Sequence, residues 1–242
     1  MSIRALIVTL CVTIFAGAVY FLRSPFVDSA LVFLEAAEMT LKIVVVSMIL
    51  TVIIAFATGI GRLSPWTPVR WLCISYVEIF RGTSALVQLF WLFYVLPLFG
   101  PKIDPFTAGV LGVSLNVGAY AAIVVEASIR AVPKAQYEAA IALNMSSFNR
   151  MRRIILPQAI RIMIPPFGNL AIQLFKLTAL VSFIGISDLT YTAYQLNQTT
   201  YLTVEVFTIV LFMYFAIGLS ITIGMKLLEK HYSRGIRLGD AR

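Results

Sequence analysis

Long apolar runs separated by short polar connections dominate the chain. Six runs are long enough to cross about 30 Å of hydrocarbon as helices, at residues 5–22, 40–61, 83–99, 105–127, 163–186 and 205–225. A shorter apolar stretch, 71–80, contains Glu78 and predicts an interfacial helix that leads into the third span. No long segment alternates with the period of two that membrane β-strands require. The pattern therefore predicts an all-α membrane protein with about six transmembrane helices.

The composition agrees with this prediction. Of 242 residues, 60% are hydrophobic and only 12% are charged, whereas soluble domains carry about 25% charged residues. The two cysteines, Cys11 and Cys73, lie in apolar stretches without metal-ligand spacing, so we expect core filling and no metal site.

Basic residues predict the orientation, because cytoplasmic loops carry an excess of Lys and Arg. In the six-span topology, fifteen of the 19 basic residues fall on one side, while Arg23, Lys42 and Lys102 fall opposite and Lys176 lies inside a span. Both termini and the loop at 128–162 are therefore expected in the cytoplasm. The net charge of +8 then reflects this face and anionic lipid headgroups, and not nucleic acid.

The loop between the fourth and fifth spans is basic, which indicates a soluble partner. Its sequence predicts a helix over 135–143, a bend at Asn144 and a second helix over 147–156 that ends before Pro157. In the second helix, Phe148, Met151 and Ile155 share one face, while the opposite face is polar.

This loop carries a recognisable pattern. Glu138-Ala139-Ala140, Ile154, Leu156 and Pro157 resemble the cytoplasmic signature of bacterial ABC-importer permeases, Glu-Ala-Ala, three residues, Gly, nine residues, Ile-x-Leu-Pro. The glycine position is Asn144 here. Because Asn adopts the left-handed backbone more readily than most other residues, we expect the bend to persist.

Three further blocks resemble the permeases that import polar amino acids such as histidine, glutamate, glutamine, arginine and opines. They are residues 76–83; residues 118–120 with 132–136; and residues 157–159 with Pro165, Pro166 and Lys176. The resemblance implies a type I ABC-importer permease fold in a bacterial inner membrane. It also implies three partners, namely a second permease subunit, a dimer of ATP-binding subunits and an extracytoplasmic solute-binding protein.

Domain organisation follows from the same resemblance. Residues 1–30 form an N-terminal transmembrane segment and outer linker, 31–228 the permease core, and 229–242 a basic cytoplasmic tail. The first segment also resembles a signal peptide, because Arg4 precedes an apolar run and Ala16-Gly17-Ala18 resembles a cleavage site.

No catalytic role is expected. The chain has no G-x-x-x-x-G-K-[ST] phosphate loop, and its one histidine, His231, lies in the predicted tail. We therefore expect no cofactor on this chain, with ATP and Mg²⁺ bound by a separate ATPase.

The resemblance also implies which loop residues couple the chain to the ATPase. The charges in the loop have simpler interpretations as well. Glu138 can stabilise a helix N-terminus through its negative charge. Arg150 lies in a basic cluster that can anchor to anionic lipid. The predicted coupling residues are Glu138, Ala139, Ala140, Asn144, Met145, Phe148, Arg150, Leu156 and Pro157.

Lys176 is the leading candidate for the substrate path, because a mid-span cation usually faces a partner, a cavity or a pathway. Alternatively, it pairs with Glu126 of the preceding span or extends to an interface. Tyr120, Gln173, Ser182 and Thr83 are further candidates, for which bonding to a neighbouring helix is the alternative.

Several positions depart from the family pattern. Ile123 and Glu126 stand where the family has Glu and Arg, Leu177-Thr178-Ala179 replaces Asp-Thr-Ser, and Ser84 replaces Pro. These departures favour a heterodimer with a more highly charged sister permease over a homodimer. A zwitterionic compatible solute such as ectoine would also suit a less charged path. A scaffold that recruits a soluble partner and a passive channel are the alternative functions.

Overall fold

The computed structural model describes residues 3–22 and 30–232, and this part of the chain contains helices and short connections but no β-strand. The predicted all-α class is confirmed. The linker residues 23–29 and the tail residues 233–242, which include parts of the predicted N-terminal and C-terminal units, lie outside the described residues. The α-helices are α1 (Ile3–Leu22), α2 (Ala30–Gly61), α3 (Thr67–Gly82), α4 (Ala85–Phe90), α5 (Pro105–Arg130), α6 (Lys134–Ala142), α7 (Ser147–Arg150), α8 (Leu156–Leu177), α9 (Leu189–Thr200) and α10 (Thr203–Tyr232).

Five helical stretches are long and apolar enough to span a membrane, and a sixth results if the bent pair α3 and 85–99 counts as one span. The prediction of about six spans is therefore confirmed. The predicted short helix over 71–80 that leads into a span over 83–99 corresponds to α3 and, after a bend of 107°, to residues 85–99. That segment consists of α4, a π-helical turn (Trp91–Val95) and a 3₁₀ turn (Leu96–Phe99).

Tertiary hydrogen bonds hold the break between α3 and α4. Thr83 and Ser84 adopt extended backbone conformations, which leaves helical carbonyls without their usual partners. Gln88 Nε2 donates to Phe80 O over 2.8 Å, and Asn116 Nδ2 donates to the same oxygen over 3.0 Å. A helix break inside a membrane is tolerated where neighbouring side chains compensate the backbone in this way.

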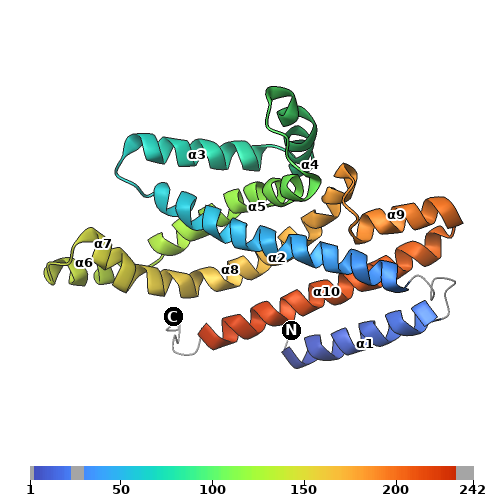
Figure 1. Cartoon of the computed structure of the whole chain (residues 1–242). Coiled ribbons are helices and arrows are strands. Elements are labelled where there is room, and N and C mark those ends of the chain that lie inside the picture. Colours follow the sequence, from blue (N-terminus) through green and yellow to red (C-terminus); the bar gives the residue numbers. More distant parts are fainter. Residues whose placement is uncertain (1–2, 23–29, 233–242) are drawn as a thin grey trace.

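The core lies where α5 packs against α2 and α8 (Figure 1). Glycine allows the closest approach, since a Cβ on Gly59 of α2 would lie 2.7 Å from Ala122 O on α5. On the other side of α8, α10 packs against α8 and α1 packs against α10. In Figure 1, α6 and α7 project from one end of the bundle, and α9 lies at the opposite end.

The second loop helix does not end before Pro157, which corrects the prediction. Instead, α7, a π-helical turn (Met151–Ile155), α8 and a final 3₁₀ turn form one helical stretch over 147–184. Pro157 lies in the first turn of α8, where a missing backbone N–H is tolerated. The π-helical turn before it is wider than an α-helical turn, so the backbone hydrogen bonds there depart from the regular α-helical pattern. The loop is thus a rigid extension of α8.

Candidate functional site

The bend at Asn144 has the predicted left-handed backbone, with φ 51°. It ends α6 with two specific hydrogen bonds. Asn144 N donates to Ile141 O over 2.8 Å, and Met145 N donates to Ala140 O over 3.1 Å. This pair of bonds is the Schellman motif, which compensates the last carbonyls of a helix and usually has glycine at the position of Asn144. Ser146 then caps α7 by accepting from Asn149 N.

Apolar side chains are exposed around this bend. Ile141 is 58% exposed, Leu143 74% and Phe148 69%, and these three residues form what we call the loop tip. Ile155, which the sequence places on the same helix face as Phe148, is fully buried, so only the Phe148 end of that face is exposed. An exposed apolar cluster on a loop outside the spans marks a surface for a protein partner.

The other predicted coupling residues surround the loop tip or support it. Glu138, Ala139 and Asn144 are exposed, and Met145 and Arg150 are half-buried. Ala140 is buried, while Leu156, which is half-buried, and Pro157, which is exposed, lie at the start of α8.

The base of the loop is bound to the bundle. Tyr137 Oη donates to Ile129 O over 3.0 Å, which ties α6 to the end of α5. Partial burial raises the pKa of Tyr137 above its ordinary value, so the hydroxyl stays a donor at neutral pH. Gln158 of α8 donates to Gln136 of α6. A force on the loop tip is therefore transmitted to both α5 and α8.

Exposed residues, three of them polar, line one side of α8 from Pro165 to its last turn. Pro165, Asn169, Gln173 and Lys176 are all exposed, at spacings of four, four and three residues, which places them on one side of the helix. Among the described residues, no carboxylate forms a salt bridge with Lys176. Amides and a cation on a membrane-spanning helix are costly against lipid, so this face, which we call the α8 polar face, is suited to a pathway or a partner subunit.

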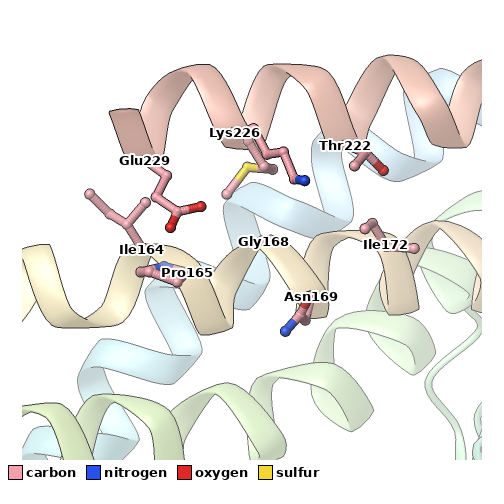
Figure 2. A pocket seen from close by; sticks show the side chains of 9 residues that line it. Ile164, Pro165, Gly168, Asn169, Ile172, Thr222, Lys226 and Glu229 are labelled. Atoms are coloured by element: carbon pink, nitrogen blue, oxygen red, sulfur yellow. The ribbon is translucent and has the colours of Figure 1, made fainter. Parts of the chain in front are cut away.

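Beside this face, α8 and α10 enclose a groove. One pocket of about 70 Å³ lies between Asn169 on α8 and Lys226 and Glu229 on α10 (Figure 2). A second pocket of about 340 Å³ continues past Ile172 and Thr222 to Lys176. The sequence reasoning did not include Asn169, although its four-residue spacing from Pro165 and Gln173 was a usable signal.

Apart from Gln173, which lies with Lys176 on the α8 polar face, the path candidates make their contacts with other residues. Glu126 pairs with Arg62 and Arg130, so the predicted alternative of a Glu126–Lys176 pair is wrong. Tyr120 lies beneath the guanidinium of Arg81, 5.4 Å from the ring centre.

The two hydroxyl candidates make local bonds. Thr83 Oγ1 donates to Ile79 O over 2.8 Å, and Ser182 Oγ donates to Ala179 O over the same distance. Both acceptors lie three or four residues earlier in the same segment, so these two bonds do not reach a neighbouring helix.

Asp188 is a buried carboxylate that the sequence reasoning did not single out. It caps α9 by accepting from Tyr191 N over 2.8 Å, and it is fully enclosed. Burial raises its pKa to about 6, against the hydrogen bonds that favour the charged form. Asp188 thus fixes the start of α9. Next to it, Leu189 N donates to Thr40 Oγ1 of α2, which ties α9 to α2.

Spanning helices, a rigid loop with an apolar tip and a polar membrane face define the permease subunit of a multi-component membrane transporter. The chain matches, over residues 9–234, the family described as "Binding-protein-dependent transport system inner membrane component". It therefore belongs to this family of inner-membrane importer subunits.

Relatives and a solved structure support the same family assignment. A protein of Sinorhizobium fredii described as "Probable amino-acid ABC transporter permease protein y4tF" is 47% identical over 206 residues, which cover 83% of this chain and 87% of that one. The "L-cystine transport system permease protein TcyB" of Bacillus subtilis is 44% identical over 62% of this chain and 64% of its own.

The structure described as "Crystal structure of an amino acid ABC transporter with histidines" is similar with a TM-score of 0.79 and 35% identity, over 85% of this chain and 96% of that one. The type I importer permease fold is thereby confirmed. The chain is a multi-pass transport subunit and not an enzyme, and neither a passive channel nor a scaffold describes it.

Proposed function

We propose that the chain helps to import a polar amino acid and that the α8 polar face contacts this solute during its passage. The observation that carries the proposal is the exposure of Asn169, Gln173 and Lys176 on one side of α8. A carboxylate is the group that best compensates an unpaired ammonium, and amides can bond either end of an amino acid. The relatives named for amino-acid and cystine transport support this solute class. Ectoine stays a narrower prediction.

The loop tip is the proposed contact with the ATPase. Ile141, Leu143 and Phe148 offer an apolar anchor, and the Asn144 bend presents them. Glu138 and Arg150 border this anchor with opposite charges. ATP and Mg²⁺ bind the ATPase subunits, whose closure moves the loops and switches the bundle between inward and outward access as packed rigid bodies.

The charges of the chain indicate its orientation in the membrane and the nature of the second permease. Both termini lie in the cytoplasm with the basic loop, as the positive-inside rule predicts. The second permease is a different chain, because Ile123 and Leu177 remove charges that the family pattern places near the path. A sister subunit that retains these charges would complete the site.

The test is purification of the assembled transporter, identification of its chains and measurement of uptake into proteoliposomes. We expect ATP-dependent import of labelled arginine, glutamine, cystine or ectoine that also requires the solute-binding protein. A complex with two copies of this chain and no other permease would refute the heterodimer. Import that needs no ATPase would refute the coupling role of the loop.

A further inference from the structure

An ionic junction joins two spans at the base of the loop. Glu126, one turn before the end of α5, accepts from Arg62 Nε through its Oε2 atom. Its Oε1 atom lies 2.9 Å from Arg130 Nη2 at the end of α5. Since Arg62 directly follows α2, one carboxylate connects the ends of α2 and α5. We call Arg62, Glu126 and Arg130 the ionic junction.

The two halves of the junction differ in burial. The side chains of Arg62 and Glu126 are 17% and 16% exposed, whereas that of Arg130 is 65% exposed. Arg62 Nη1 is enclosed and has no hydrogen-bond partner among the described residues. The enclosed guanidinium therefore depends on Glu126 for compensation, and breaking this pair costs far more than breaking a solvated one.

Backbone contact reinforces the junction. Gly59 precedes Arg62 by less than one helical turn, and a Cβ there would lie 2.7 Å from Ala122 O and from Val125 Cβ. The backbones of α2 and α5 therefore touch directly beside the ion pair. Helices held by both backbone contact and an ion pair at one end are expected to move as a single body.

The junction is also close to the loop. The turn after Arg130 leads into α6 at Lys134, and Tyr137 Oη ties α6 back to Ile129 O. A displacement of α6 thus reaches Glu126 through one helical turn and one hydrogen bond. The chain itself links the loop to α5 on one side and to α8 on the other, so the junction is the polar link that adds α2 at this end.

We propose that Glu126 is a positioning residue for ATP coupling. It fastens α2 to α5 at the base of the loop, so that a movement of the ATPase-bound loop shifts both spans together. This inference rests on the proposed docking of the loop tip on the ATPase. Without the Arg62–Glu126 pair, packing alone holds α2 to α5 at this end, so a smaller part of the loop movement reaches α2 and more ATP is hydrolysed per solute imported.

The test uses the whole transporter in proteoliposomes with its binding protein, and it measures solute imported per ATP hydrolysed. In Glu126→Gln, which keeps the side-chain shape, we expect this ratio to fall roughly five- to tenfold, within the usual range of coupling energies. Arg130→Gln is the matched control, because it removes only the exposed half, and its ratio should stay within about twofold of wild type. The exchange Arg62→Glu with Glu126→Arg should restore at least half of the wild-type ratio.

Three results would overturn the inference: a ratio in Glu126→Gln close to that of wild type, a parallel loss of import and hydrolysis, or an exchange variant that stays uncoupled. If Glu126→Gln does not assemble, Glu126→Asp, which keeps the charge on a shorter side chain, is compared by the same ratio. Wild-type transporter that shows no ATP-driven import would contradict the proposed function itself and not this junction. The two failures are thus distinguished by the wild-type arm.

Discussion

Replacing Asn144 by valine tests the bend through the backbone alone. The side chain at 144 is exposed, so a larger residue meets no packed neighbour, while φ 51° remains required. A left-handed backbone costs ordinary residues roughly 1–2 kcal/mol, and Asn pays less than a β-branched residue. If valine leaves this conformation, the two hydrogen bonds that end α6 are lost as well, at about 1 kcal/mol each.

We therefore expect valine to destabilise the bent loop by about 2 kcal/mol relative to Asn, which is roughly a 30-fold shift in its population. Binding of the purified ATPase to the permease should weaken by a similar factor, measured by titration in nanodiscs, and ATP-driven uptake should fall with it. Asn144→Gly should bind at least as well as wild type, because glycine has no left-handed penalty.

The matched control is Asn149→Val, the same chemical change on the same loop, at an exposed position with helical backbone. It should cost only the small helix-propensity difference, well below 1 kcal/mol. The reasoning fails if Asn144→Val binds the ATPase as tightly as Asn149→Val does, or if Asn144→Gly binds more weakly than wild type.

Three further changes test the packing, the outer cap and the polar face. Gly59→Ala should destabilise the protein by about 1–3 kcal/mol, because its Cβ would meet Ala122 O. The effect should appear as a lower Tm in detergent. Gly224→Ala is the control, because Gly224 faces open space, and it should not lower the Tm. Burial holds the pKa of Asp188 at about 6, above its ordinary 3.8, so its protonated form favours the fold. Stability should therefore decline as the pH rises from about 4 to about 6, and a Tm series in which Asp188→Asn shows the same decline would contradict this assignment. Lys176→Met should lower uptake by about tenfold or more, the effect of losing one charged hydrogen bond, while ATPase binding stays unchanged; undiminished uptake would exclude a solute contact.

The sequence predicted the features that local physics determines. The spans are readable because hydrocarbon requires apolar helices of a minimum length, and the bend is readable because few residues accept the backbone that Asn144 adopts. A helix boundary near Gly82 was predicted, but the bend of 107° there was not, since one of the hydrogen bonds that hold it comes from Asn116 in the next span. The continuation through Pro157 was missed because a proline is equally at home just after a helix and in the first turn of the next one.

The path residues were predicted less well, because a hydropathy pattern states which residues lie within a span but not which face they occupy. Lys176 and Gln173 do lie on one exposed face. Glu126 was assigned to the same region on charge alone, yet it lies one turn from the end of α5, within reach of the two arginines that follow α2 and close α5. Two arginines in direct contact compensate the carboxylate at that end, so it does not pair with Lys176.

The position of Glu126 changes what the path can recognise. A carboxylate beside Lys176 would neutralise it, and a solute would have to displace that pair. With Glu126 held in the ionic junction, the described part of the α8 polar face offers a cation and two amides, which suit the α-carboxylate that all amino acids share. Lys176→Met should therefore reduce uptake of every transported amino acid by a similar factor, in a competition assay with labelled mixtures. A changed order of preference among these solutes would instead show that Lys176 contacts their side chains.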